Sequence, residues 1–220
     1  MMSPNRANTP SSEELVARLR LNDREAFALL YERHSGPSFE YAVRMLADRR
    51  EAEDVVQDAF LRVFLAARRG GYDPAKGSFR TYLYRILRNL CYDRAATRRP
   101  VSASDLDGHG DGSLDPLAGG LADPITPEDQ ASVRCLRQRV AGALEHLPAM
   151  QREALVLRSF EGLSYKEIAR VLDRPVAHVK ILLFRARRAL ARWLAAPGAA
   201  GGKCAQAGRP AAAPSREVRR

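Results

Sequence analysis

The sequence predicts an all-α protein with two small helical domains joined by a flexible acidic linker. Three observations support this fold class. Apolar residues recur at helical spacing, and a Ser, Asn or Asp repeatedly stands three residues before a Glu, as at helix starts. Residues 100–125, in contrast, are rich in Ser, Asp, Gly and Pro and lack periodicity. We expect domains at residues 11–99 and 126–195, with disordered tails at residues 1–10 and 196–220.

The first domain is expected to contain four helices. Three capping pairs mark helix starts: Ser11 with Glu14, Asn22 with Glu25, and Asp48 with Glu51. Together with the apolar periodicity they predict helices over residues 12–20, 23–47, 49–69 and 79–98. We expect an interruption of the second helix around Ser35-Gly36-Pro37, because proline removes a backbone donor and crowds the preceding turn. Glycines and a proline in residues 70–78 exclude a continuous helix there.

The second domain ends in a predicted helix-turn-helix. Ser164 and Glu167 have capping-box spacing, so a helix begins there. Asp173-Arg174 fills a tight connection, and Pro175 suits the first turn of a second helix. The linker before this domain, as a coil of about 25 residues, would span roughly 28 Å on average and stretch to about 85 Å. The two domains could therefore occupy sites far apart.

The charge of the chain points to a polyanionic partner. Its 36 Lys and Arg exceed its 26 Asp and Glu by 10, and residues 101–130 hold acids but no Lys or Arg. Three distant cysteines and four histidines form no metal-ligand spacing, so we expect neither a zinc site nor a disulfide framework. The chain has no apolar signal region or membrane-length apolar run, so we expect a cytoplasmic protein.

Two helix faces in the first domain have an unusual composition. Opposite the apolar stripe of helix 79–98 lie Tyr82, Arg85, Asn89 and Tyr92, with Thr81 and Arg88 beside them. This face either contacts single-stranded nucleic acid or is simply solvated. Facing away from the core stripe of helix 49–69 are Asp54, Gln57, Asp58, Leu61 and Leu65. These residues either form a docking surface for a basic, partly apolar helix or are covered by another helix of the domain.

The last helix of the second domain is strongly basic. It contains no Asp or Glu, and at or within it stand Arg174, Lys180, Arg185, Arg187, Arg188 and Arg192. The alternatives are a DNA-binding helix and an amphipathic core helix with a solvated basic face. The coincidence of turn, cap and charge favours contact with duplex DNA.

With these motifs identified, the chain resembles bacterial RNA polymerase sigma factors of the extracytoplasmic-function class in the sigma-70 family. The resemblance is carried by AFALLYERHSGPSFEYAVRML, REAEDVVQDAFLRVF and YDPAKGSFRTYLYRILRNLCYDRAATRR for region 2, and by LPAMQREALVLRSFEGLSYKEIARVL with VKILLFRARRAL for region 4. It implies that region 2 docks on the beta-prime clamp helices of core RNA polymerase and melts the minus-10 element by capturing a nontemplate base. Region 4 is then expected to recognise the minus-35 element in the major groove and to contact the beta flap.

The resemblance assigns roles to individual residues. Polymerase contacts are implied at Asp54, Gln57, Asp58 and Leu61, with Leu65 on the same face. Minus-10 contacts are implied at Tyr72, Lys76, Ser78, Phe79, Arg80, Tyr82, Arg85, Arg88, Asn89, Tyr92, Arg94, Arg98 and Arg99. Minus-35 contacts are implied at Ser164, Tyr165, Lys166, Arg174, Val176, Ala177, His178, Lys180, Ile181, Leu182, Arg185 and Arg188.

The chain departs from the family pattern at the recognition helix and at the minus-10 face. Ile181 and Leu182 replace the usual Ser-Arg, which adds apolar surface where DNA is expected. Either the promoter presents thymine methyl groups there or minus-35 contacts are weak. Tyr82 stands where tryptophan is common, and its smaller ring predicts changed melting efficiency in the same role.

The function expected from the sequence is that of a transcription initiation factor acting on duplex promoter DNA and its nontemplate single strand. We expect no catalytic residues, cofactor or metal, because no nucleophile with a base, paired carboxylates or phosphate-binding glycine loop is present. The resemblance also implies an anti-sigma factor as a candidate partner. The main alternative is a stand-alone helix-turn-helix regulator with a helical dimerisation or sensing domain. An enzyme with a DNA-binding tail is disfavoured.

Overall fold

A computed structural model describes residues 10–97 and 139–195, and within these ranges every regular element is a helix. The all-α prediction is confirmed. The linker, both tails, residues 126–138, Arg98 and Arg99 lie outside the described residues. Within the described ranges, no helix is long and apolar enough to cross a membrane, and no three His, Cys, Asp or Glu side chains are grouped to hold a metal ion.

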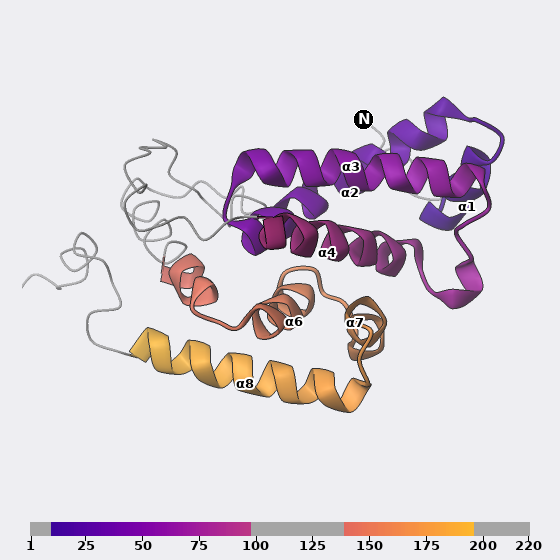
Figure 1. Cartoon of the computed structure of the whole chain (residues 1–220). Helices are drawn as coiled ribbons and strands as arrows, with labels where there is room; N and C mark the ends of the chain where they lie inside the picture. The colour runs from indigo at the N-terminus through magenta and orange to yellow at the C-terminus, as the bar shows by residue number, and fades with distance from the viewer. Residues whose placement is uncertain (1–9, 98–138, 196–220) are drawn as a thin grey trace, which may run out of the picture.

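The N-terminal bundle consists of four helices. They are α1 (Ser12–Leu19), α2 (Arg24–Leu46), α3 (Arg49–Arg68) and α4 (Phe79–Thr97), and the short 3₁₀ turn η2 (Pro74–Lys76) lies before α4 (Figure 1). Tyr41, Phe60, Phe79, Leu83 and Leu87 are fully buried in its core. Buried aromatic and branched side chains of this size supply most of the stabilisation of a small helical domain.

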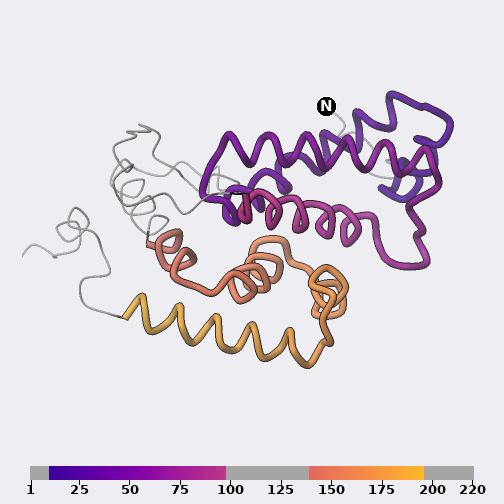
Figure 2. The backbone as a smooth tube through the Cα atoms, in the orientation of Figure 1, coloured from indigo at the N-terminus to yellow at the C-terminus, as the bar shows by residue number. Residues whose placement is uncertain are grey.

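The C-terminal bundle lies against α4. Residues 139–145 are helical and are followed by α6 (Ala149–Ser159), α7 (Tyr165–Leu172) and α8 (Val176–Ala195). Leu157, Leu163, Ile168, Val179 and Leu183 form its buried core. The backbone trace shows α6 and α7 on the side of α4, whereas α8 runs along the far side of the bundle (Figure 2).

The predicted helix starts are largely confirmed, with one correction. The Ser11 and Ser164 hydroxyls accept from the backbone N–H groups of Glu14 and Glu167 in complete capping boxes, and Asp48 caps α3. The prediction that Asn22 caps the second helix is wrong. Asp23 accepts from Ala26 N–H instead, while Asn22 adopts a left-handed conformation with φ 61° in the preceding turn. Adjacent Asn and Asp residues are both good caps, so spacing alone does not separate them.

The predicted interruption of the second helix is also wrong, because α2 continues through Pro37. Pro37 itself is exposed, so its ring lies on the solvent side of the helix and not in the core. Leu30 and Tyr41, on either side of it, are fully buried and hold both halves of the helix in the core. Tertiary packing therefore outweighs the local cost of the proline. At the other end of the molecule, α8 begins at Val176, one residue after Pro175, whose carbonyl accepts from His178 and Val179.

Candidate nucleic-acid interface

The outward face of α3 combines carboxylates with exposed leucines. Leu61 is 55% exposed and Leu65 is 42% exposed, and no helix of the described residues covers them. Gln57 is also exposed. The alternative in which another helix of the domain buries these leucines therefore does not hold for residues 10–97 and 139–195. An apolar pair beside two carboxylates suits a partner that offers both cations and apolar groups.

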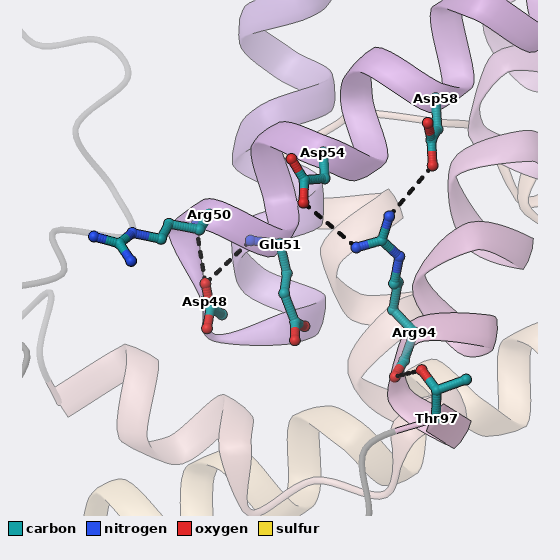
Figure 3. Close-up of polar contacts among 7 residues, drawn as sticks. All are labelled: Asp48, Arg50, Glu51, Asp54, Asp58, Arg94 and Thr97. Carbon is teal, nitrogen blue, oxygen red and sulfur yellow. Dashed lines mark hydrogen bonds and ion pairs between the residues drawn. The ribbon is translucent and has the colours of Figure 1, made fainter. Parts of the chain in front are cut away.

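Asp54 and Asp58 are paired with Arg94 from the end of α4, as Figure 3 shows. The guanidinium nitrogens lie 3.5 Å from an Asp54 oxygen and 3.3 Å from an Asp58 oxygen. The Thr97 hydroxyl donates to the Arg94 carbonyl at 2.9 Å. The family resemblance implied a minus-10 contact for Arg94, whereas in this structure Arg94 pairs with the acidic face of α3. Nothing in the local sequence marks this pairing, since its partners are 36 residues or more away.

The loop before α4 is held together by two aromatic side chains from the predicted minus-10 set. Tyr72 is buried, its hydroxyl donates to the Gly77 carbonyl at 3.2 Å, and its ring centroid lies 5.2 Å from that of Tyr82. Burial raises the pKa of Tyr72 to about 12. Phe79 is fully buried, and its backbone N–H donates to Glu13 at 2.9 Å. The expectation that Tyr72 and Phe79 side chains contact DNA is therefore not met in this arrangement, in which both shape the loop from inside.

A cavity of about 270 Å³ lies beside this loop. Its lining includes the hydroxyl-bearing Ser78 and Thr81, the ring of Tyr82 and the cations Lys76 and Arg85. One further cation in the lining, Arg170, comes from α7 of the C-terminal bundle. A space that offers an aromatic ring, hydroxyls and cations together can hold an anionic or hydrogen-bonding planar group.

The tyrosine and arginine face of α4 is divided between solvent and the C-terminal bundle. Arg85 and Asn89 are exposed, as the prediction of a nucleic-acid face requires. Arg88 and Tyr92 instead reach the Glu153 carboxylate, at 3.1 Å in each case. Arg80 lies 3.7 Å from a carboxylate oxygen of Glu161 and also donates to the Glu161 carbonyl. The predicted face is therefore not one continuous open surface.

Both carboxylates that divide the face were missed by sequence analysis. Glu153 is 0% exposed and accepts from the hydroxyls of Tyr41 and Tyr92 as well as pairing with Arg88. Burial raises the pKa of the Glu153 carboxyl, and Arg88 with the two tyrosines opposes that shift. Glu161 is also buried, and burial likewise raises its pKa. Their partners are 61 to 112 residues away, so local sequence gives no signal for them.

The helix-turn-helix is formed as predicted. Asp173 ends α7 in a left-handed conformation with φ 52°, which turns the chain tightly into α8. A groove of about 510 Å³ between the two helices is lined by the cations Lys166, Arg170 and Arg174 together with Pro175 and Val176. Exposed members of the predicted set are Ser164, Lys166, Arg174, Ala177, Lys180, Ile181, Arg185 and Arg188, and Tyr165, Val176 and His178 are half-buried.

The exposed apolar surface on α8 differs from the one expected from Ile181 and Leu182. Leu182 is only 6% exposed and packs into the core of the C-terminal bundle, so the expectation that it faces DNA is wrong. Ile181 is 47% exposed. Phe184, which sequence analysis did not select, is 65% exposed one helical turn from Ile181. Helical periodicity in the sequence could have predicted both positions. Leu182 continues the apolar stripe of Val179 and Ala186, whereas Phe184 lies outside that stripe.

Comparison with known families matches both bundles. A Sigma-70 region 2 family model matches residues 30–100, and a Sigma-70, region 4 family model matches residues 137–190. The RNA polymerase sigma-H factor of Pseudomonas aeruginosa is 35% identical over 185 residues, covering 81% of this chain and 91% of that protein. The ECF RNA polymerase sigma-E factor of Escherichia coli is 37% identical over 188 residues, covering 82% and 92%.

Solved structures give the same fold. CnrH in complex with the cytosolic domain of CnrY has a TM-score of 0.62 and 26% identity, covering 84% of this chain and 97% of that one. The sigma factor RpoE of Bartonella quintana, in complex with the anti-sigma factor NepR, has a TM-score of 0.51 and 23% identity, covering 83% and 92%. The latter likeness supports the fold alone.

Proposed function

Because this chain belongs to the extracytoplasmic-function (ECF) RNA polymerase sigma factors of the sigma-70 family, proteins of transcription initiation, we propose that it binds core RNA polymerase and directs it to particular promoters. In this proposal it recognises the minus-10 and minus-35 elements and helps to melt the DNA. It acts in the cytoplasm and catalyses no step itself, since the nucleotide chemistry belongs to the polymerase.

The cavity beside the loop before α4 is the main support for the proposal that the protein helps to melt DNA. Its volume of about 270 Å³ and its lining of Tyr82, Ser78 and Arg85 suit an unstacked base and the phosphate attached to it. Flipping a base costs a few kcal/mol of unstacking, which ring stacking and hydrogen bonds in the cavity would offset. The exposed Arg85 and Asn89 would extend this contact along the nontemplate strand.

The outward face of α3 is proposed to dock on the beta-prime clamp helices. Exposed leucines beside the carboxylates of Asp54 and Asp58 support a contact that is apolar at its centre and charged at its edge. An anti-sigma factor, as seen with RpoE of Bartonella quintana, is proposed to compete for the same surface. The beta flap would contact the C-terminal bundle.

Minus-35 recognition is proposed for α8. The exposed Lys180, Arg185 and Arg188 would neutralise phosphates on both sides of the major groove. Between them, Ile181 and Phe184 present apolar surface that fits thymine methyl groups. The base contacts of this helix are therefore expected to be mainly apolar.

Transcription with purified components tests the proposal. Core RNA polymerase and this protein are incubated with sheared genomic DNA of the source organism, and transcript 5′ ends are mapped. We expect start sites that share upstream elements and disappear when the protein is omitted. A stand-alone regulator would leave core polymerase unable to initiate at any specific site, and this outcome would reject the proposal.

A further inference from the structure

Helix α1 contacts the loop before α4, residues 72–79, at both ends of that loop. The proposed base cavity is lined from this loop by Tyr72, Asp73, Lys76, Gly77 and Ser78. The Sigma-70 region 2 family model begins at residue 30, so α1 lies before the segment that the family model describes. The contribution of α1 to the cavity therefore has to be inferred from its contacts.

Glu13 of α1 binds the last residue of the loop. One of its carboxylate oxygens accepts from the Phe79 backbone N–H at 2.9 Å. Phe79 is the first residue of α4, and a backbone N–H at this position has no partner within its own helix. Ser78 does not supply one, because its hydroxyl accepts from the Thr81 N–H at 3.3 Å. Glu13 therefore completes the cap of α4 although it lies 66 residues away in the sequence.

The negative charge of Glu13 also suits the start of α4. The N-terminus of a helix carries a partial positive charge, which a nearby carboxylate stabilises. The first turn of α4 contains no acid of its own, and its second residue is the cation Arg80. Glu13 thus supplies from another helix both the hydrogen-bond acceptor and the charge that the start of α4 lacks.

Arg20, directly after α1, contacts the first residue of the loop. Its guanidinium donates to the Tyr72 carbonyl at 3.4 Å, a longer and weaker bond than that of Glu13. One guanidinium nitrogen also lies 3.9 Å from the position that a side chain on Gly70 would take. Gly70 has a φ of 71°, a left-handed conformation that turns the chain after α3. Arg20 therefore packs on this turn and binds the start of the loop.

Helix α1 is itself fixed in the N-terminal bundle. Its Leu15 side chain is fully buried. At its first residue, the Ser12 hydroxyl lies 2.8 Å from a ring nitrogen of His34 on α2. The His34 ring in turn meets the Phe79 ring edge to face, with 5.1 Å between the centroids. Glu13 is therefore held in place by the core and by a polar contact, so it can fix the backbone to which it binds.

The two contacts of α1 affect the shape of the cavity. Ser78 lines the cavity and directly precedes Phe79, so a displacement of the Phe79 backbone would carry Ser78 with it. At the other end, Tyr72 lines the cavity and its hydroxyl donates to the Gly77 carbonyl inside the loop. A binding group must be held within about 0.5 Å of its working position to select its ligand. Fixing both ends of the loop meets this requirement.

We propose that α1 sets the base selectivity of the minus-10 site: Glu13 and Arg20 are positioning residues that hold the two ends of the loop and so determine which base fits the cavity. This inference rests on the proposed function for the identity of the ligand. It adds a role for a helix that lies before the matched part of region 2. Neither side chain lines the cavity, so both act through the loop.

Hydrogen exchange of the Phe79 amide in the free, full-length protein tests whether Glu13 holds the loop. Glu13→Ala removes the acceptor, and we expect the amide to exchange about tenfold faster or more, because its N–H loses its partner. Glu13→Gln keeps an acceptor oxygen without the charge and should restore most of the protection. Circular dichroism verifies that both variants retain their helices. Unchanged exchange in Glu13→Ala would overturn the inference.

Base selectivity of the holoenzyme tests whether this contact acts in promoter opening. On a promoter found by the transcript mapping, each base of the minus-10 element is replaced in turn, and the rate of open-complex formation is measured. For the unsubstituted protein, we expect replacement of the captured base to slow opening about tenfold or more. Glu13→Ala should reduce this penalty to about threefold or less, and Glu13→Gln should retain most of it. Arg20→Ala removes the weaker contact and should reduce the penalty less.

A control separates positioning from a general loss of stability. Ala28→Gly, at an exposed position of α2, weakens the same bundle through helix propensity without touching α1 or the loop, and it should keep the full penalty. Full base selectivity in Glu13→Ala, or an equal loss in Ala28→Gly, would overturn the inference and leave the proposed function intact. Failure of the unsubstituted protein to open any promoter would reject the proposed function, whereas exchange at Phe79 would still decide whether α1 holds the loop.

Discussion

Tyr82 is half-buried, and its position shows how one side chain can serve the fold and the proposed site. Its ring lies beside the buried Tyr72 ring, at 5.2 Å between centroids, while it also lines the cavity next to the α4 loop. Burial raises the pKa of its hydroxyl, so the side chain stays neutral near pH 7. A neutral ring fixed from behind by a second ring is a suitable platform for a base.

Loss of this ring should affect promoter melting more than promoter binding. Tyr82→Ala is expected to lower the rate of open-complex formation by about tenfold or more, because base stacking on an aromatic side chain contributes about 1–3 kcal/mol. Permanganate reactivity of unpaired thymines measures opening, and filter binding on ice measures the closed complex. Tyr82→Phe keeps the ring and serves as the matched control. An equal loss in both assays would argue against a role in melting.

At the scale of single helices, the sequence predicted the structure best. The capping residues Ser11, Asp48 and Ser164 identified the starts of α1, α3 and α7, because a cap is a contact over three residues. Pro37 was misleading, since the packing that keeps α2 continuous comes from distant residues. The same limit applies to the site. The exposed α3 face followed from helical periodicity, but no local pattern could indicate that Arg94 pairs with Asp58 or that Glu153 meets Arg88.

The α3 face gives a prediction about polymerase binding. Asp58→Arg reverses the charge at the centre of that face, and we expect the affinity for core RNA polymerase to fall at least about tenfold, as for like charges in an interface. The fold should survive, because the pair with Arg94 is partly exposed and such pairs contribute little to stability. Labelled core polymerase in a fluorescence titration measures the affinity. Glu32→Arg, at an exposed position of α2, is the control. Unchanged affinity of Asp58→Arg would remove α3 from the interface.

The exposed apolar pair on α8 predicts a particular kind of base contact. Replacing thymine by uracil removes only the methyl group, so at the minus-35 position beside Ile181 it should weaken binding of the holoenzyme about fourfold, the value of one buried methyl group. Ile181→Ser should make the protein indifferent to that exchange. Competition binding with thymine and uracil promoters forms a double-mutant cycle. A response to uracil that is the same in both proteins would exclude the contact.

At the scale of the whole molecule, the two bundles are joined by two buried carboxylates, Glu153 and Glu161. Glu153 faces Arg88, Tyr41 and Tyr92, with Cys91 and Arg152 nearby. Glu161 faces Tyr84, Arg80 and Arg44, with Glu40 nearby. Burial raises the pKa of both carboxyls above the ordinary value of 4.5. The packed bundles therefore bind protons more tightly than the unfolded chain, in which water solvates both carboxyls.

Acidification should consequently strengthen the packing of the two bundles. A carboxyl whose pKa is raised in the packed form contributes fully below its ordinary pKa of 4.5, and the contribution is lost as pH rises through the raised pKa. The double substitution Glu153→Gln and Glu161→Gln removes both titrating groups. The difference in free energy of unfolding between the unsubstituted protein and this variant, measured by urea denaturation, should therefore change in favour of the unsubstituted protein as pH falls from 7 to 5. A change in the opposite direction would contradict the assignment.

The pairing of Arg94 with Asp54 and Asp58 also fixes the charge that α3 shows to a partner. Two carboxylates and one guanidinium leave a local charge of −1 instead of −2 (Figure 3). A partner that supplies a single lysine would neutralise this local charge of −1. A partner that displaces Arg94 would instead face the full charge of −2 from Asp54 and Asp58. The same displacement would free Arg94 at the end of α4, the helix whose exposed Arg85 and Asn89 form the proposed nucleic-acid face. Docking at one surface would thereby add positive potential to the other.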